Sequence, residues 1–207
     1  MTALNFVIQP DQIVLATDTL SLAAADGEPL SFVTKFLVLP HLRTVATGTG
    51  NGPFLAEWYS YVRASVLAQD VDHLNQYSPS ALRRIAAGHD LAAISATVYH
   101  FGYSRGRDRF LAYAYRSTSD FSSEEILEGF GVEPQVAFSE LDLSAPEVFV
   151  QLMERQRADD QALPKGKRIG IGGEIQCVHM QRDGISISTI HRFASYDDDY
   201  GAACARL

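Results

Sequence analysis

The chain has 207 residues and a formal net charge of −8; 46% of its residues are hydrophobic and 20% are charged, which is enough apolar material to build a core. These values exclude an intrinsically disordered chain, and the acidic balance excludes a general nucleic-acid-binding protein. The length fits a single domain over residues 1–207. Only three of the 17 basic residues are lysines, namely Lys35, Lys165 and Lys167.

The first forty residues are predicted to form strands joined by tight turns, with a short further strand after them. Turn-forming pairs occur at Pro10-Asp11 and at Asp26-Gly27. The strongest β pattern in the chain covers residues 32–39 and is closed by Pro40. The predicted strands in this part of the chain are 4–8, 13–16, 32–39 and 44–47.

A glycine-rich loop over residues 48–53 is expected to lead into a helix. Asn51 is suited to be the N-cap and Pro53 to lie in the first turn. A second helix is predicted to start at Ser78 and to end near Ala87. The first helix has apolar residues at helical spacing, which are Phe54, Trp58, Tyr61, Val62, Val66 and Leu67.

The rest of the chain returns to strands. Residues 94–103 and 109–116 are predicted to pair as a hairpin, and residues 117–136 are predicted to be loop with room for one helical turn. A third helix is expected over 145–160, followed by a hairpin of 169–180 with 185–193. Because hairpins dominate and the helices come in blocks, the pattern indicates an α+β fold with antiparallel sheets rather than a βαβ fold.

The two turns near the amino end predict which strand residues face each other. If Pro10-Asp11 is a two-residue turn, residue 9 faces residue 12, and Thr2 then lies opposite Thr19. If Asp26-Gly27 is a two-residue turn, residue 25 faces residue 28, and Lys35 then lies opposite Asp18. The two registers together predict that Thr2, Asp18 and Lys35 meet on three adjacent strands.

These three residues have complementary chemistry. A lysine among apolar residues loses its hydration, and a carboxylate such as Asp18 compensates for that loss. A threonine hydroxyl becomes nucleophilic when a base takes its proton, and a free amino-terminal amine can be that base. Thr2 becomes the amino-terminal residue if Met1 is removed. The ammonium group of Lys35 would favour the alkoxide that develops on Thr2.

The amino-terminal residues resemble a proteasome β-type subunit, a member of the Ntn (amino-terminal nucleophile) hydrolases. The resemblance rests on Thr2, the segment Ile-Val-Leu-Ala-Thr-Asp-Thr at 13–19, Lys35, and Ala-Thr-Gly-Thr-Gly at 46–50 before a helix. It covers the first seventy residues well and the remainder only by the order of elements. It implies a four-layer αββα sandwich, in which two antiparallel sheets lie between helix layers.

The resemblance also implies a function and a set of site residues. Thr2 would be the nucleophile and, through its amine, the general base; Asp18 would orient Lys35, and the backbone amide of Gly48 would bind the oxyanion. The expected activity is a threonine-type hydrolase of amide or peptide bonds, acting on a peptide or a small amide. Members of this group form rings, so the resemblance implies a homo-oligomer.

Part of the family pattern is missing from this chain. Aligned on Gly172-Gly173, the supporting Asp and Ser of the family fall at Arg168 and Ile171. Neither side chain can orient the amine or take part in proton transfer. The alternative function is therefore a non-catalytic, proteasome-like protein that self-assembles or binds a partner.

Simpler interpretations exist for the same residues. Asp18 can end a strand and begin a turn, and Lys35 can protect the edge of a sheet with its amine in solvent. The glycines at 48–52 can bind phosphate through exposed amides before a helix, which would make the protein a small-ligand binder. This segment contains neither of the glycine-rich nucleotide-binding motifs.

The remaining sequence features predict absences. Cys177 and Cys204 are too few for a disulfide framework, and neither they nor the six histidines show metal-ligand spacing. We therefore expect no metal and no cofactor. No stretch approaches about 20 apolar residues, and the first five residues lack the basic region of a signal peptide. A cytoplasmic protein with no membrane and no nucleic-acid partner is expected.

Overall fold

The amino-terminal hairpin forms as its turn residues predict. The computed structural model describes residues 2–23, 25–137 and 146–206, and in it β1 (Leu4–Ile8) pairs antiparallel with β2 (Gln12–Asp18). The backbone amide of Gln9 donates to the carbonyl of Gln12 at 2.9 Å, which closes the two-residue turn at Pro10-Asp11. Leu4 faces Thr17 in this register, so the first predicted register is confirmed.

Within the described residues the strands form two five-stranded antiparallel sheets and one small two-stranded sheet. Sheet 1 has the order β10-β1-β2-β11-β12, and sheet 2 has the order β5-β6-β7-β8-β9. The added strands of sheet 1 are β10 (Gly129–Glu133), β11 (Glu174–Gln181) and β12 (Gly184–Arg192). Sheet 2 consists of β5 (Phe36–Leu39), β6 (Thr44–Gly50), β7 (Ala96–Ser104), β8 (Arg109–Arg116) and β9 (Ser123–Ile126). The small sheet pairs β3 (Leu20–Leu22) with β4 (Pro29–Phe32).

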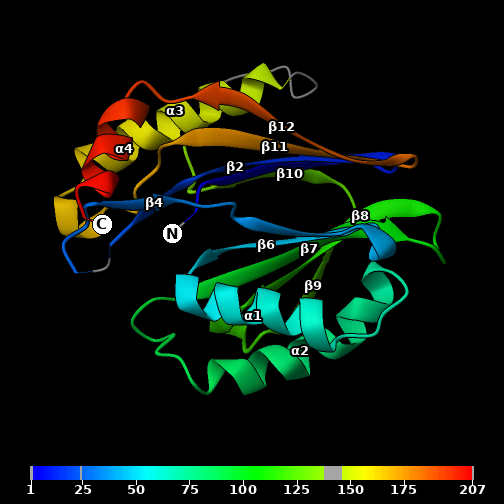
Figure 1. The fold of residues 1–207 in the computed structure, drawn as a ribbon. Helices are drawn as coiled ribbons and strands as arrows, with labels where there is room; N and C mark the ends of the chain where they lie inside the picture. Colours follow the sequence, from blue (N-terminus) through cyan, green and yellow to red (C-terminus); the bar gives the residue numbers. More distant parts are fainter. Residues whose placement is uncertain (1, 24, 138–145, 207) are drawn as a thin grey trace.

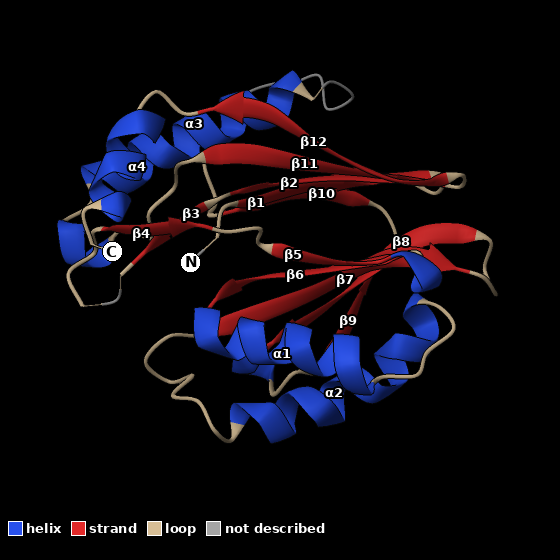
Figure 2. Cartoon of the chain, viewed as in Figure 1, coloured by secondary structure: helices blue, strands red, loops and turns tan. Residues whose placement is uncertain are grey.

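The two large sheets face each other, and helices lie outside them (Figure 1). Helices α1 (Gly52–Ser65) and α2 (Val71–Ala86) cover the outer face of sheet 2. Helix α3 (Glu147–Ala162) covers sheet 1, and α4 (Tyr196–Cys204) packs beside β4 (Figure 2). Short 3₁₀ turns occur at Pro40–Leu42, Ser117–Ser119 and Lys165–Lys167. The structure thus combines helices with antiparallel sheets, as expected for the predicted α+β fold.

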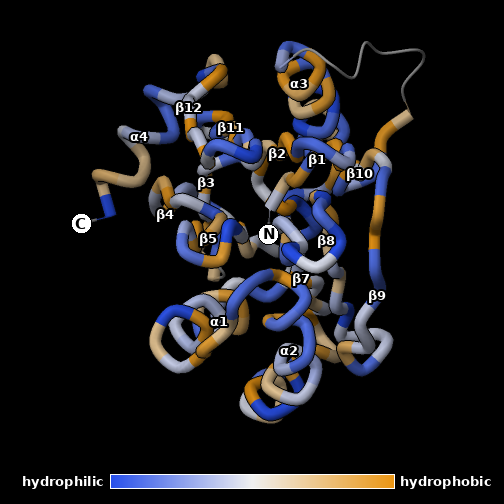
Figure 3. Tube along the Cα trace, turned by 90° about the vertical axis from the view of Figure 1, so that its right-hand side faces the viewer, coloured by the Kyte–Doolittle hydropathy of each residue, from blue (hydrophilic) through white to orange (hydrophobic). Residues whose placement is uncertain are grey.

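Apolar side chains fill the spaces between these elements. One cluster lies between the two sheets and includes Phe6, Leu15 and Phe101, and another lies between sheet 1 and α3. The tube view shows hydrophobic residues in α1, α2 and α3 and in strands of both sheets (Figure 3). No helix in the described residues is long and apolar enough to cross a membrane.

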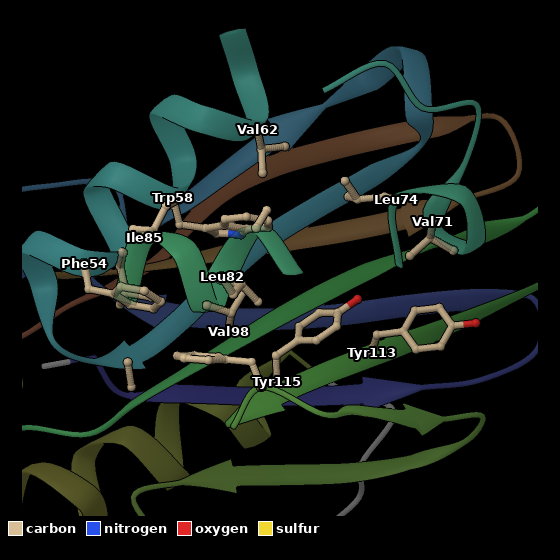
Figure 4. Close-up of a cluster of buried hydrophobic side chains, with 14 of the residues drawn as sticks. Phe54, Trp58, Val62, Val71, Leu74, Leu82, Ile85, Val98, Tyr113 and Tyr115 are labelled. Atoms are coloured by element: carbon tan, nitrogen blue, oxygen red, sulfur yellow. The ribbon is translucent and has the colours of Figure 1, made fainter. Parts of the chain in front are cut away.

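The cluster between α1, α2 and sheet 2 holds the sole tryptophan of the chain. Trp58 and Phe54 of α1 are fully buried against side chains of α2, β7 and β8 (Figure 4). Burying side chains of this size contributes roughly 1.5–3 kcal/mol each. Of the apolar face predicted for this helix, Phe54, Trp58 and Val62 are buried, whereas Leu67 lies beyond the helix and is 89% exposed.

Helix α1 begins where the cap residues predict. Asn51 is its N-cap, and its side-chain oxygen accepts a hydrogen bond from the amide of Phe54 at 3.0 Å. An Asn51→Ala variant should lower the free energy of unfolding by about 1 kcal/mol, because that amide loses its partner. Urea denaturation measures the loss. An Asn51→Asp variant keeps the acceptor and should unfold close to the wild type; equal losses in both variants would contradict the capping role.

The second helix and several later strands differ from the predictions. Helix α2 begins at Val71 after an Asp70 cap, so the predicted start at Ser78 is wrong, and Pro79 lies inside the helix. Proline removes one backbone hydrogen bond, but the apolar face of α2 buried on sheet 2 outweighs that loss. Residues 117–136 are not mainly loop, because they contain β9 and β10.

The carboxyl-terminal elements follow the predicted order with different bounds. β11 starts at Glu174 rather than at residue 169, and the helix α4 was not predicted. Helix α3 contains the predicted buried face of Val148, Leu152 and Met153. Its predicted start at residue 145 lies outside the described residues.

Candidate functional site

Lys35 and Asp18 form a buried ion pair at one end of the two sheets. The Lys35 Nζ atom lies 2.8 Å from Oδ1 and 2.9 Å from Oδ2 of Asp18. The side chain of Asp18 is 0% exposed and that of Lys35 is 8% exposed. An ion pair this deeply buried is held in one geometry and is little screened by salt. The interpretation of Lys35 as a solvent-facing edge residue is therefore wrong.

Asp18 is the centre of this site because it accepts hydrogen bonds from three segments of the chain. It is the last residue of β2, and besides Lys35 it accepts from the backbone amide of Ala3 at 2.9 Å and from that of Gly172 at 3.3 Å. The bond from Ala3 ties the start of the chain to the carboxylate. The bond from Gly172 brings in the segment before β11, so residues far apart in sequence meet here.

Thr2 directly precedes the amide that Asp18 holds. Its side chain is buried, with 7% of the residue exposed. Continuing the register of β1 and β2 by two residues beyond Leu4 and Thr17 places Thr2 level with Thr19, as the first turn predicts. The expectation that Met1 is removed concerns a residue outside the described part of the chain.

Lys35 reaches Asp18 by a different route from the predicted one. The turn after β3 is wider than two residues, because the amide of Ala23 donates to the carbonyl of Glu28. The register of β3 with β4 then joins Leu20 to Phe32 and shifts after Ser21, so the second predicted register is wrong. The predicted strand 32–39 is broken, and Lys35 lies in the link of residues 33–35 between β4 and β5.

Gly48 lies in β6, one residue after Thr47, which faces Phe36 of β5. A Cβ atom at Gly48 would lie 2.5 Å from Cδ2 of Leu55 and 2.6 Å from the carbonyl oxygen of Thr97. The glycine therefore lets α1 pack directly on β6, which is a structural reason for this residue. Residues 48–50 belong to the strand rather than to an open loop, so the predicted loop begins too early.

Substitution of this glycine tests the packing. A Gly48→Ala variant should lose about 1–3 kcal/mol of unfolding free energy, because the added methyl group forces Leu55 and the strand apart. Thermal unfolding followed by circular dichroism measures the loss. Gly52→Ala is the matched control, since a Cβ at Gly52 meets nothing within 4 Å. A Gly48→Ala protein as stable as the Gly52→Ala protein would contradict the close approach.

The two positions where the family pattern fails are outside the ion-pair cluster. Arg168 is exposed and donates from Nε to the carbonyl of Leu163 at 2.9 Å and from Nη2 to that of Gln161 at 2.8 Å, at the end of α3. Ile171 is 4% exposed and packs in the apolar cluster under α3. Neither side chain can supply a proton or accept one.

Several residues of the site were missed at the level of sequence. The backbone amide of Gly172 contacts Asp18, and the Gly172-Gly173 pair was the only signal for it. The hydroxyl groups of Thr47 and Tyr59 both face the carbonyl of Lys35, and no pattern in the sequence indicates that contact. In the described residues, no group of three or more His, Cys, Asp or Glu side chains could hold a metal ion.

Comparison with known proteins adds a fold relationship. No protein-family model matches the sequence, and no curated protein matches it. Among solved structures, the Anbu (Gly-1) mutant from Hyphomicrobium sp. strain MC1 is similar with a TM-score of 0.65 at 13% identity, over 99% of this chain and 93% of that chain. Identity this low shows the fold alone. The chain therefore shares the fold of Anbu, and this likeness does not reach the narrower resemblance to a β-type subunit.

Proposed function

We propose that this protein is a threonine-type Ntn hydrolase that cleaves amide or peptide bonds. The observation that carries the proposal is the buried Lys35–Asp18 pair, whose carboxylate also binds the amide of Ala3, directly after Thr2. Burying a cation and a carboxylate costs desolvation energy, and such buried charges are common at sites where a negative charge develops on a nucleophile. The fold shared with Anbu is consistent with this class.

In the proposed reaction, the Thr2 hydroxyl oxygen attacks the carbonyl carbon of the substrate. Its proton passes to the free amine of Thr2, exposed when residue 1 is cleaved, and the ammonium of Lys35 stabilises the developing negative charge. The Gly48 amide binds the oxyanion. The leaving amine takes the proton as the C–N bond breaks, and water then hydrolyses the Thr2 ester to release the acid. Asp18 keeps Lys35 oriented throughout.

The remaining expectations belong to the same proposal. The substrate class is a peptide or a small amide, and no metal or cofactor takes part. The proposed architecture is a four-layer αββα sandwich in a single domain over residues 1–207, and the protein is proposed to self-assemble into a homo-oligomer such as a ring. Its proposed compartment is the cytoplasm.

Mass spectrometry tests the proposed nucleophile. The intact mass of protein made in cells is measured before and after incubation with an epoxyketone or a β-lactone, which react with an amino-terminal threonine. We expect loss of Met1 and one adduct, mapped to Thr2. A Thr2→Ala variant should lose the adduct and keep its fold, whereas Thr189→Ala, on the exposed strand β12, should label normally. Retained Met1 without an adduct would overturn the proposal.

The second candidate function is a non-catalytic, proteasome-like assembly or binding protein. The position of Arg168 at the end of α3 and of Ile171 in an apolar cluster favours it, because the family's supporting Asp and Ser have no equivalent at those positions. This candidate predicts a folded protein that assembles normally and takes up no probe. Size-exclusion chromatography with light scattering, run beside the labelling, separates the two functions.

A further inference from the structure

The main chain of Lys35 lies at a gap in the strand pairing. β4 ends at Phe32 and β5 begins at Phe36, so residues 33–35 belong to neither strand. A strand partner normally fixes a residue's carbonyl through ladder hydrogen bonds. At Lys35 two side-chain hydroxyl groups are directed at the carbonyl oxygen: Thr47 Oγ1 donates at 2.7 Å, and the Tyr59 hydroxyl lies at 3.4 Å.

The two donors come from elements that are themselves well anchored. Thr47 is in β6, is 0% exposed and faces Phe36 in the ladder with β5. Tyr59 is in α1, next to the buried Trp58, and desolvation raises the pKa of its phenol, so the hydroxyl stays protonated and can donate. The Thr47 bond has ordinary length, whereas the Tyr59 contact is long and weaker. Thr47 is therefore the main donor and Tyr59 the supporting one.

We propose that Thr47 and Tyr59 are positioning residues that act through Lys35, an inference that rests on the proposed function. The lysine side chain has several rotatable bonds, and ordering it costs up to about 2 kcal/mol of conformational entropy. Meeting both Asp18 oxygens at 2.8 and 2.9 Å requires a fixed Cα position as well. The two hydroxyls hold the carbonyl of this residue, which lies between β4 and β5, and so help to keep the ammonium paired with Asp18.

A purely structural role makes a different prediction. Any buried carbonyl needs a hydrogen-bond partner, and loss of the Thr47 hydroxyl would then lower stability without moving the Lys35 ammonium. Thr47→Val removes the hydroxyl and keeps the branched shape, and Thr47→Ser keeps the hydroxyl. Tyr115→Phe is the matched control, because it removes another buried phenol, one that donates to Asn75 of α2 at 2.8 Å and not to Lys35.

The low lysine content allows a direct measurement that needs no activity. Protein grown with ¹⁵N-labelled lysine gives only three labelled side-chain Nζ atoms. Lys165 and Lys167, in an exposed 3₁₀ turn, serve as internal references. We expect Thr47→Val to shift or broaden the Lys35 Nζ resonance alone, Tyr59→Phe to do so to a smaller degree, and Thr47→Ser to restore it. Tyr115→Phe should leave all three resonances in place.

The rate of probe labelling is the second readout. Thr47→Val should lower the maximal rate of Thr2 labelling by about tenfold, with little change in the probe concentration that gives half of that rate, since the probe contacts are intact. If Thr47→Val only lowers stability, as Tyr115→Phe does, and leaves both the Lys35 resonance and the labelling rate unchanged, the positioning role is wrong. If wild-type protein takes up no probe, the proposed function fails, while the Lys35 resonance still decides whether Thr47 positions the lysine.

Discussion

Replacing Lys35 by methionine is expected to lower the free energy of unfolding by about 3–5 kcal/mol. The reason is the burial of its partner, because Asp18 is 0% exposed and would be left with an uncompensated charge. The hydrogen bonds from the amides of Ala3 and Gly172 remain, but they offset only part of the cost of burying the carboxylate charge. The same change removes the cation that is proposed to activate Thr2, so labelling of Thr2 by the β-lactone should fall to background.

A second variant separates the charge from the packing. In the double variant Lys35→Met/Asp18→Asn no charge is left at this site, and the asparagine oxygen can still accept from one of the two amides. We expect it to be more stable than Lys35→Met alone, while labelling stays at background. Urea denaturation at pH 7.5 measures both proteins. A Lys35→Met protein within 1 kcal/mol of the wild type would show that the pair is not desolvated as the structure indicates.

Acidification is expected to destabilise the protein through His100, a residue remote from the proposed chemistry. His100 is fully buried on β7, its Nε2 atom accepts a hydrogen bond from Trp58 Nε1 at 3.1 Å, and its ring packs against Trp58 and Tyr115. Desolvation by burial lowers its pKa from 6.5 to about 3. The folded protein therefore keeps His100 neutral, whereas the unfolded chain takes up a proton below about pH 6.5.

The sign and the pH range follow from that difference. The unfolded state binds more protons between about pH 6.5 and pH 3, so stability falls as the pH falls through this range, by about 2 kcal/mol between pH 7.5 and pH 5 for this one group. Above pH 7 the contribution is constant. A His100→Gln variant can still accept from Trp58 and cannot be protonated, so it should lack this part of the acid sensitivity.

Wild type and His100→Gln are compared by urea denaturation at pH 7.5, 6 and 5. Unfolding is monitored by the fluorescence of Trp58, the sole tryptophan. Acid effects from the carboxylates are common to both proteins and cancel in the difference. Parallel pH dependences for wild type and His100→Gln would contradict the prediction.

Local patterns were sufficient for much of the fold. The turn at Pro10-Asp11 set the register of β1 with β2, and the cap Asn51 set the start of α1, because each depends on groups within a few residues. Strand β9 was missed because its Ser-Glu-Glu-Ile sequence has no apolar alternation. Its backbone hydrogen bonds come from β8, and a single-sequence pattern carries no information about such a partner.

The candidate site was likewise predicted in part from the sequence. Residue chemistry and the spacing of Thr2, Asp18 and Lys35 indicated the ion pair, and the structure contains that pair although one of the two registers used to predict it is wrong. The wide turn after β3 and the break at residues 33–35 change the path of the chain, yet Lys35 still reaches Asp18. A desolvated ammonium group is stabilised by a nearby carboxylate, and this stabilisation does not depend on the path that the backbone takes between them.

Local patterns predict the α+β class with antiparallel sheets, the amino-terminal hairpin and the residue types of one charged site. The packed fold was needed to find that Gly172 donates to Asp18, that Thr47 and Tyr59 face the Lys35 carbonyl, and that Arg168 and Ile171 have their side chains elsewhere. The difference lies in the distance over which each interaction acts. Turns, caps and charge complementarity act between near neighbours or through residue type, whereas a backbone amide from residue 172 reaches residue 18 only after two sheets have packed.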